Sequence, residues 1–285
     1  MKLHLNQHEY HDFNKFRINC GNCSGLCCAA LYFSRYDGFP YDKKAGEPCR
    51  CLDGNFRCLI HGELGSKKLK GCLSYDCCGA GPITAALYPG VDWKSAPDKA
   101  GEIFDVFVKT FYLQQIQWYL TEILYLLPAE PLWEESRILI FGLHSLLHSS
   151  PKEILEFDAE NLKLKVNPLF KNTIKFVKMK VNHSNRTPRK TNLIAHNFQN
   201  TVLDGVDFSS SLLIAANLEG CRLTGSCLLG ADLRDANIKN ADLSECIFLT
   251  QNQLNTAAGN SKTRIPGHLL RPLTWKKQAG ATIPY

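Results

Sequence analysis

The run ADLRDANIKNADLSE, from Ala231 to Glu245, carries the pattern that decides the fold of the C-terminal part of this chain. It consists of five-residue units with alanine first and leucine or isoleucine third. The same period of five places a large apolar residue at Leu193, Phe198, Leu203, Phe208, Leu213, Leu218, Leu223, Leu228, Leu233, Ile238, Leu243 and Phe248. Two residues before most of these positions stands a small side chain, and His196 and Val206 depart from that rule. A period of five fits neither a helix nor a flat strand. It predicts a chain that turns a corner every five residues, with one large and one small side chain pointing inward on each side.

These units resemble the pentapeptide-repeat family, whose standard repeat is matched by Ala231-Asp-Leu-Arg-Asp and by the two units that follow it. The resemblance covers residues 191–250 and implies a right-handed quadrilateral β-helix of about three coils, with four units in each coil. Residues twenty apart would then stack at roughly the 4.8 Å spacing of neighbouring strands. Such a stack leaves an edge at each end and needs caps. The segment from Thr250 to Ala258, followed by Gly259, is predicted to be a short capping helix.

Ten of the thirteen cysteines lie between residues 20 and 78, at spacings typical of metal ligands. They occur as Cys20-x2-Cys23-x3-Cys27-Cys28, Cys49-x-Cys51, Cys58-Leu-Ile-His61 and Cys72-x4-Cys77-Cys78. Two thiols separated by two residues can grip one ion from a single tight turn. The glycine-rich segment 20–92 buries little apolar surface, so we expect it to be irregular and to need its metal in order to fold.

The same thiol pattern resembles the zinc- or iron-chelating CxxCxxxCC proteins of bacteria, which include the flagellin lysine methylases. The match covers about residues 17–80. It implies as ligands Cys20, Cys23, Cys27, Cys28, Cys49, Cys58, Cys72 and Cys77, with His61 as a further candidate. Cys51 and Cys78 are held in reserve because the family pattern does not require them. Eight thiolates could satisfy two tetrahedral zinc ions, or one Fe–S cluster with further roles for the others, and the sequence leaves zinc and iron both open.

Bulk composition places the chain among ordinary soluble proteins. Hydrophobic residues make up 45% and charged residues 21% of its 285 positions, and the formal net charge is +6. The N-terminus lacks the apolar stretch of a secretory signal, and no apolar run is long enough for a membrane span. We therefore expect a cytoplasmic protein, and a reducing compartment favours bound metal over the alternative, a disulfide framework.

The middle of the chain is predicted to be helical. A capped start at Ser95 opens a helix that Pro128 ends, a second helix runs from about 132 to 147, and a short third one covers 150–157. Leu162-Lys-Leu-Lys-Val166 alternates as a strand does, and residues 174–181 could be strand or helix. His144 and His148 share a helix face, where packing is a commoner role than metal ligation.

The expected fold class is α+β and multi-domain. It comprises an irregular Cys-rich metal-binding region (1–92), a helical region packed on it (93–160), a basic connector that also caps the β-helix (161–190), the β-helix itself (191–250), and a C-terminal cap and tail (251–285). The connector and its surroundings are basic, since residues 162–190 hold nine basic and no acidic residues. Cys221 and Cys246 occupy the small inward position, where a small hydrophobe is expected, and Cys227 receives no role.

The sequence predicts a cytoplasmic bacterial metal-binding protein whose β-helix face is a docking scaffold for a protein partner. One alternative is a metal- or cluster-dependent protein-modifying enzyme resembling the flagellin lysine methylases, and no catalytic residue is identified for it. Another is a DNA mimic that binds DNA gyrase, as some pentapeptide-repeat proteins do. Three coils make a short rod, and three basic against seven acidic residues make it only modestly negative, so the mimic ranks last. Neither a membrane nor a nucleic acid is expected as a partner.

Overall fold

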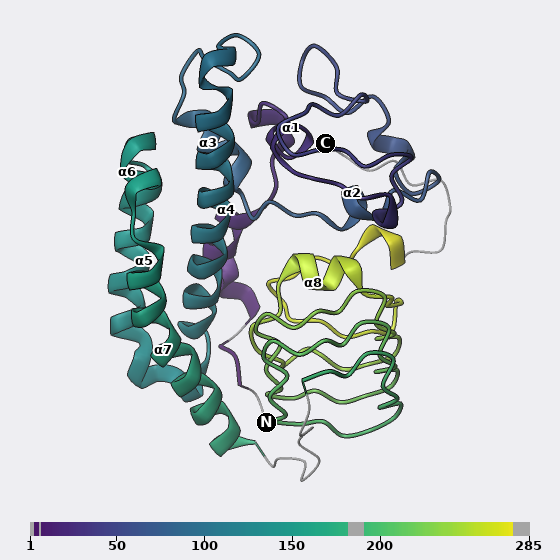
Figure 1. Cartoon of the computed structure of the whole chain (residues 1–285). Helices are drawn as coiled ribbons and strands as arrows, with labels where there is room; N and C mark the ends of the chain where they lie inside the picture. The colour runs from purple at the N-terminus through teal and green to yellow at the C-terminus, as the bar shows by residue number, and fades with distance from the viewer. Residues whose placement is uncertain (1–2, 6, 182–190, 276–285) are drawn as a thin grey trace. The chain divides into compact units, whose positions relative to one another are not determined.

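The computed structural model describes residues 3–5, 7–181 and 191–275, which belong to two units (Figure 1). The repeat unit contains the chain up to Asp12, Tyr119–Arg137 and the segment from Asn161 onward. The thiol unit contains Phe13–Trp118 and Ile138–Glu160. Two helices, α4 (Ala100–Ile123) and α5 (Trp133–Leu147), contribute residues to both units. Within the described residues, every helix is too short or too polar to cross a membrane.

The first hundred residues form short helices joined by turns. The bounds are η1 (Gln7–Phe16), η2 (Cys20–Asn22), α1 (Leu26–Ala30), η3 (Arg35–Asp37), η4 (His61–Glu63), α2 (Lys70–Ser74), α3 (Ala80–Ala86) and η5 (Pro97–Lys99), where η marks a 3-10 helix. The irregular character expected of 20–92 is therefore interrupted by single helical turns. Aromatic contacts supply much of its apolar packing, such as Phe33 stacked on Phe39 at 4.8 Å between ring centroids.

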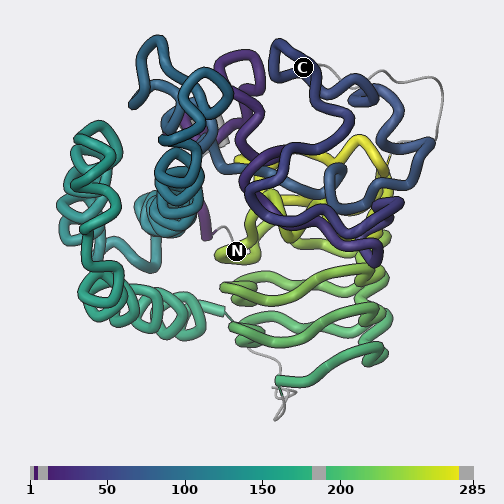
Figure 2. The backbone as a smooth tube through the Cα atoms, turned by 45° about the horizontal axis from the view of Figure 1, so that its top comes forward, coloured from purple at the N-terminus to yellow at the C-terminus, as the bar shows by residue number. Residues whose placement is uncertain are grey.

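The repeat segment, residues 191–248, winds into stacked coils that we call the repeat coils (Figure 2). Parallel bridges join positions twenty residues apart on each side of the coil, as in Asn192 to Leu212 to Asp232 and Asn197 to Asn217 to Asn237. The predicted stacking of residues twenty apart is thus confirmed. Each bridge is flanked by backbone hydrogen bonds in both directions, for example Leu193 N to Leu212 O at 2.9 Å and Leu212 N to Thr191 O at 2.8 Å.

The expected fold class, α+β with a right-handed quadrilateral β-helix, is wrong. The described residues contain helices and isolated bridges, and no continuous strand or sheet occurs among them. The physical reason is the corner in every five-residue unit. The chain turns soon after each bridge position, so the next residue cannot also pair with the neighbouring coil and no continuous strand forms. The repeats are also only the C-terminal part of a chain whose regular elements are helical.

The corners depend on a left-handed backbone residue at every fifth position. Positive φ recurs without a break at Ala195, Asn200, Gly205, Ser210, Ala215, Gly220, Gly225, Gly230, Asp235 and Asn240. Glycine, asparagine and aspartate tolerate this region best. At Gly220 a side chain would also collide, because an added Cβ would stand 2.2 Å from Asn200 Oδ1.

Large and small inward side chains fill the coil interior as the repeat predicts. Leu213, Leu223 and Leu243 are fully buried, and so is the small residue Ala236. Phe248, the last large residue of the series, is also buried, but its ring lies 5.5 Å from that of Phe170 and 5.7 Å from that of Tyr119, against the helices. Cys221 and Cys246 are 1% and 0% exposed at the small position, which confirms their expected role as small hydrophobes. Cys227 is also buried, although it lies one residue before Leu228 on the bridge position.

Residues of the chain itself close the C-terminal end of the repeat coils. The predicted capping helix is confirmed as α8 (Gln251–Thr256), whose Thr250 cap and Gln253 form a capping box. The chain then makes part of a further coil, in which Ala258 pairs with Asn237 and Arg264 with Asp242. The last element, η7 (Leu273–Trp275), places the Trp275 indole N–H 3.0 Å from the carbonyl of Ala257. The end of the stack is thus extended by about one irregular turn beyond the prediction.

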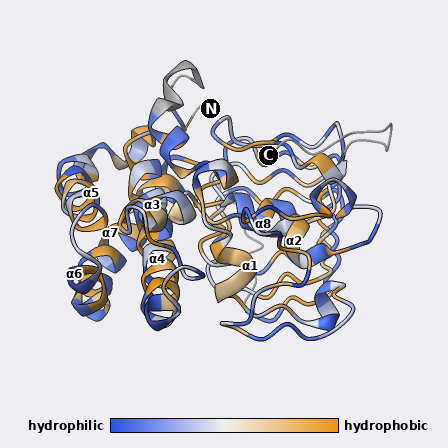
Figure 3. Ribbon diagram, turned by 90° about the horizontal axis from the view of Figure 1, so that it is seen from above, coloured by the Kyte–Doolittle hydropathy of each residue, from blue (hydrophilic) through white to orange (hydrophobic). Residues whose placement is uncertain are grey.

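The central helices match the sequence prediction, and each carries hydrophobic and hydrophilic stretches (Figure 3). In addition to α4 and α5, the structure has η6 (Leu127–Leu132) and α6 (Pro151–Glu156). A capping box between Ser150 and Glu153 starts α6. Pro151 is the first residue of α6, where its missing N–H leaves no helical hydrogen bond unmade, so it also favours that start.

The predicted strand at Leu162–Val166 is wrong, because these residues lie inside helix α7 (Ala159–Lys180). The alternation of leucine and lysine covers only five residues, whereas the longer pattern is helical. The buried residues of α7 are Leu162, Val166, Leu169, Phe170, Thr173 and Val177, at spacings of three and four. Leu164, which the alternation placed on the apolar face, is 75% exposed. Residues 174–180 are accordingly helix rather than strand. Part of the predicted basic connector, 182–190, lies outside the described residues.

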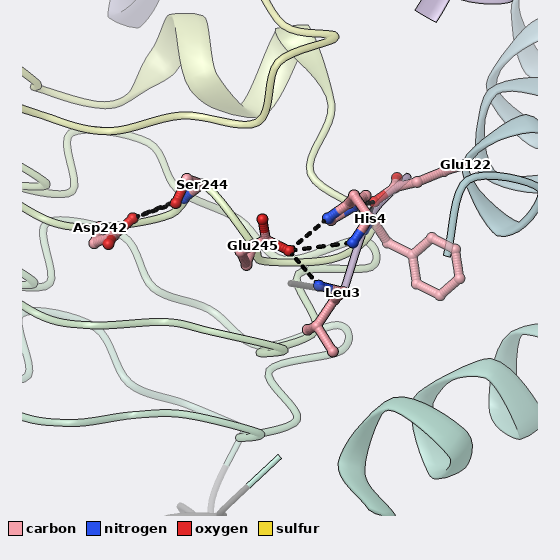
Figure 4. A network of polar contacts seen from close by, with 7 residues as sticks. Leu3, His4, Glu122, Asp242, Ser244 and Glu245 are labelled. Carbon is pink, nitrogen blue, oxygen red and sulfur yellow. Dashed lines mark hydrogen bonds and ion pairs between the residues drawn. The ribbon is translucent and has the colours of Figure 1, made fainter. Parts of the chain in front are cut away.

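The N-terminal segment is fastened to the repeat coils by a buried ionic network (Figure 4). Residues 3–5 pair with 125–127 through a bridge between His4 and Leu126. Glu245 Oε2 accepts the backbone N–H of Leu3 at 2.8 Å and lies 3.2 Å from His4 Nδ1. On the other side of the ring, His4 Nε2 lies 3.8 Å from Glu122 Oε1, and that oxygen accepts the N–H of Phe248 at 2.8 Å. His4 therefore lies between two carboxylates.

Burial alone lowers the pKa of His4, but the hydrogen bonds and charges of Glu122 and Glu245 outweigh burial and raise it to about 9. Burial raises the pKa of Glu122, while His4 opposes that shift. A protonated His4 therefore offsets the free-energy cost of burying the Glu122 carboxylate.

The first prediction tests the inward and outward positions of one repeat unit. Leu213→Ala, at a residue with no exposed surface, should lower the free energy of unfolding by about 2–5 kcal/mol through the cavity that it leaves. The adjacent Leu212 is 40% exposed, and Leu212→Ala should cost less than about 1 kcal/mol. Urea unfolding of both variants measures the difference. Equal losses would contradict the inward direction assigned to Leu213.

The second prediction concerns the pH dependence of the N-terminal network. The folded-state pKa of His4 is raised from 6.5 to about 9, so its stabilisation is fully present below pH 6.5 and is lost as the pH rises through 9. His4→Gln should lower the free energy of unfolding by about 3 kcal/mol near pH 6, and by much less near pH 10. The control is His196→Gln, at an exposed histidine of the same unit. A His4→Gln deficit that stays constant from pH 6 to 10 would show that the ring is neutral in the folded protein.

Candidate metal centre

The predicted thiols come from short segments of the thiol unit. Cys20 begins η2 and Cys23 follows it, Cys27 and Cys28 lie in α1, Cys49 and Cys58 lie in turns between η3 and η4, Cys72 lies in α2, and Cys77 precedes α3. Backbone contacts bring these segments together. Cys49 donates its N–H to the carbonyl of Cys28 at 2.9 Å. Cys58 forms an antiparallel bridge with Leu52, three residues after Cys49.

One group of thiols converges on the first turn of α3. A Cβ added at Gly81 would lie 2.7 Å from Cys23 Sγ and 3.8 Å from Cys77 Sγ, so both sulfur atoms approach the same bare backbone position. The charges of Cys23 and Cys77 also act on the Cys27 thiol, whose Sγ lies 4.0 Å from that of Cys28. Cys23, Cys27 and Cys77 therefore form a first group.

A second group surrounds Cys28. Burial raises the pKa of Cys58 and of Cys72, and the neighbouring sulfur atoms of Cys28, Cys49 and Cys51, when ionised, raise both pKa values further. Because Cys27 and Cys28 are adjacent in sequence and belong to different groups, α1 is where the two groups meet. Burial raises the pKa of Cys20, the charge of Cys28 raises it further, and the guanidinium of Arg57 opposes the shift.

Backbone N–H groups point at four of the predicted sulfur atoms. Cys23 accepts from Gly25 and Leu26, and Cys77 accepts from Gly79 and Gly81. Cys49 accepts from Cys51 at 3.5 Å, and Cys58 accepts from Ile60. In each case the donor lies two to four residues after the cysteine, as in a tight turn around a ligand. Such bonds favour the ionised sulfur over the thiol.

The thiols are otherwise held in their protonated form by burial. Burial is the first cause that raises the pKa of Cys72 and of Cys77 to about 12, and that of Cys58 to about 11. Cys28 is the exception, because the hydrogen bond from Cys27 lowers its pKa and the charge of Lys43 lowers it further. The same bond raises the pKa of Cys27 well above its usual value. A thiophilic cation would have to displace these protons in order to bind.

Sequence reasoning missed the role of Lys43. This side chain is 2% exposed, and its ammonium donates to the carbonyls of Ala29, Leu31 and Lys44. The charge is thereby held beside Cys28 at the end of α1. In the sequence, Lys43 stands in a polar run that looks like an exposed turn, so no signal marks it. The bare Cα of Gly81 was likewise hidden, because one glycine among many in this segment does not stand out.

The reserve ligands differ in their positions. Cys78 is buried against α4, where its Sγ lies 3.9 Å from the carbonyl of Gln114 and its own carbonyl accepts from Gln114 Nε2 at 3.1 Å. Cys51 lies near the second group. His61 begins η4 and donates its backbone N–H to the carbonyl of Cys58 at 3.2 Å. The exposed rings of His144, in the last turn of α5, and His148, just after it, lie 4.3 Å apart between centroids and are tilted by 48°.

The thiols of the two groups lie near one another, but their sulfur atoms do not have the arrangement of the ligands around a metal ion. Across residues 3–5, 7–181 and 191–275, no three His, Cys, Asp or Glu side chains are close enough together to hold a metal ion. All thirteen cysteines are free thiols. The structure thus brings the predicted residues into two neighbourhoods, and their sulfur atoms remain more widely spaced than the ligands of one ion.

Comparisons with known proteins support the repeat assignment. The family model described as Pentapeptide repeats matches residues 191–228 and 211–248. A pentapeptide repeat protein from the Arabidopsis thaliana thylakoid lumen is 23% identical over 28% of this chain and 50% of its own length, with a TM-score of 0.20. A pentapeptide repeat protein from Nostoc Pcc 7120 is 28% identical over 35% of this chain and 92% of its own, with a TM-score of 0.21. At these TM-scores the two structures carry no argument about the arrangement of this chain.

A full-length relative extends the match beyond the repeats. The Bacillus subtilis (strain 168) protein named Uncharacterized protein YybG is 36% identical over 263 residues, which cover 90% of this chain and 94% of that protein. Because the aligned region covers 90% of this chain, it extends beyond the repeat coils into the thiol segment. The chain therefore belongs to the same family as YybG, and it is a pentapeptide-repeat protein in its C-terminal part.

Proposed function

We propose that this protein binds zinc or iron through the thiols of its N-terminal segment. The proposal is supported by two features of the cysteines taken together: their convergence in space and the hydrogen bonds that backbone N–H groups donate to their sulfur atoms. Cysteines far apart in sequence approach one another, and four of them receive backbone N–H groups. A ligated sulfur keeps a negative charge that such donors stabilise. Because the buried Cys227 of the repeat coils accepts a backbone N–H in the same way, it is the convergence of the thiols that distinguishes the N-terminal segment.

The donor set fits a thiophilic ion, because thiolates are the ligands that zinc, iron–sulfur clusters and other soft metals select. Cys23, Cys27 and Cys77 would hold one centre, with Cys20 available as the fourth ligand. Cys28, Cys49, Cys58 and Cys72 would hold a second one, with Cys51 beside it. Zinc would supply a cross-link between the short helices, and iron would add a redox couple. The free thiols of this unit suit a reducing compartment such as the cytoplasm.

The third prediction tests the ligand assignment. Protein purified without oxygen should contain metal, and the double variant Cys23→Ser/Cys77→Ser should lose roughly half of it, because only the first centre is disrupted. The matched control is Cys221→Ser, since Ser211 and Ser226 already occupy the same small inward position in other coils. Elemental analysis measures the content, and absorption near 400 nm separates a cluster from colourless zinc. Unchanged metal in the double variant would refute the assignment of Cys23 and Cys77.

The fourth prediction uses the close approach at Gly81 without removing a ligand. In Gly81→Ala the new Cβ would meet Cys23 Sγ at 2.7 Å, so the sulfur must move and metal affinity should fall by roughly 10- to 100-fold. Gly101→Ala, in α4, meets nothing within 4 Å and serves as the control. Competition with a chromogenic chelator measures both affinities. If Gly81→Ala binds metal as tightly as the control, the convergence of thiols over α3 has no part in binding.

A further inference from the structure

Helix α7 presents lysines on the side that its buried residues leave free. Lys171 and Lys175 are exposed and Lys178 is half-buried, and none of the three belongs to the buried set of the helix. Residues three and four apart are neighbours on a helix surface, so the three side chains leave α7 on one face. We call Lys171, Lys175 and Lys178 the lysine row. Lys165 and Lys180, both exposed, flank the row on the same helix.

No acidic residue lies near the lysine row in the sequence. Residues 161–203 contain neither aspartate nor glutamate, while nine of them are lysine or arginine. Residues 182–190, which lie outside the described part of the chain, belong to this stretch and contribute positive charge only. Among the ion pairs found within residues 3–5, 7–181 and 191–275, none includes a member of the row. The row therefore carries uncompensated positive charge.

This arrangement differs from that of the other surface helices. In α6, Lys152 lies 3.8 Å from Glu156, four residues further along the helix. At the same spacing in α7, Lys171 is followed by another lysine, Lys175. Like charges four residues apart destabilise a helix, whereas opposite charges stabilise it. An anion bound along the lysine row would remove this repulsion.

The apolar residues of α7 argue against a lipid surface as that anion. A helix that lies in a membrane interface inserts a continuous apolar face among the lipid chains. The apolar face of α7 is already buried within the protein. Leu164 and Met179 are 75% and 69% exposed, but about 22 Å of helix axis separates them. Two such isolated side chains do not form an apolar face.

The residue types of α7 fit a nucleic-acid duplex better than a protein or a single strand. Lysine is depleted at interfaces between proteins, whereas interfaces with DNA are strongly positive. Single strands are held largely by bases that stack on exposed aromatic rings. Over the described length of α7, Ala159–Lys180, the aromatic residues are Phe170, which is buried, and Phe176, which is half-buried. The helix thus offers charge without a stacking platform.

We propose that the lysine row binds the phosphate backbone of double-stranded DNA, without reading its sequence. A duplex carries one negative charge per about 1.7 Å of its axis, so phosphates are dense enough to meet each lysine of the row. The exposed amides of Asn167 and Asn172, on the same helix, can donate hydrogen bonds to phosphate oxygens. The inference does not depend on metal binding.

The sequence alone does not predict this contact, because it assigns the lysines to different elements. The strand expected at Leu162–Val166 and the connector beyond it would give the basic residues no common face. One continuous helix places Lys171, Lys175 and Lys178 together and turns the apolar residues between them inward. The change from strand to helix therefore turns a scattered basic run into a charged surface.

The test measures binding of a fluorescent 20-base-pair duplex to the full-length chain by anisotropy, between about 25 and 200 mM salt. Lys171→Gln/Lys175→Gln should reduce the slope of log affinity against log salt by about two, since each lost phosphate contact removes about 0.9. At 50 mM salt its affinity should fall at least about tenfold. Lys171→Arg/Lys175→Arg should bind as the wild type does, which separates the effect of charge from damage to the helix.

The matched control is Lys239→Gln/Lys262→Gln, which removes the same charge from two exposed lysines of the same unit and should leave the slope unchanged. Absence of duplex binding at 50 mM salt, or equal losses in the two glutamine variants, overturns the proposal. Tighter binding of a polyglutamate peptide, of phosphatidylglycerol vesicles or of a single strand of equal length also overturns it, because the occupant is then a different anion.

Discussion

The repeat coils depend on one backbone constraint, a left-handed residue at every fifth position. Only this conformation turns the chain through a corner soon enough for the next side to begin, and ten consecutive corners from 195 to 240 obey it. Three of those corners carry alanine or serine, for which positive φ is unfavourable. Ser210 and Ala215 keep the conformation because the large inward residues on either side, Phe208, Leu213 and Leu218, are fully buried, and the bridges fix the register. Packing therefore overrides local preference at these corners.

The series of corners ends where the N-terminus of the chain attaches. Glu245 occupies the next corner position without a positive φ, and the left-handed residue appears instead at Phe248. The released backbone lets the Glu245 carboxylate face Leu3 and His4, while the N–H of Phe248 turns to Glu122. One irregular repeat thus joins the last coil to both the first residues and helix α4. The repeat coils therefore end in an irregular repeat at residues 245–248, whereas the first coil keeps the regular pattern.

The sequence predicted the repeat coils well because their signal is periodic and local. Each inward position is specified by its own residue, and the twenty-residue bridges follow from counting. At Leu162–Val166 the prediction failed because a short alternating pattern competed with a longer helical one. The predicted fold class failed because the name β-helix implies strands, and each five-residue side of the coil is too short to form one. Lys43, Gly81 and the network of His4 with Glu122 and Glu245 were beyond reach, because each depends on contacts between residues distant in sequence.

The thiol segment poses the opposite problem, since its residue types were evident and their geometry was not. Turns after Cys23, Cys49, Cys58 and Cys77 aim N–H groups at sulfur, which is the local conformation that the proposed ligands would need. What separates the sulfur atoms is the spacing between segments, set by short helices with few buried residues. Such segments resist small displacements weakly, because little apolar surface must be exposed to move them. Closure around a cation would exchange thiol protons for metal bonds, and those bonds would add their own free energy to the stability of the thiol segment.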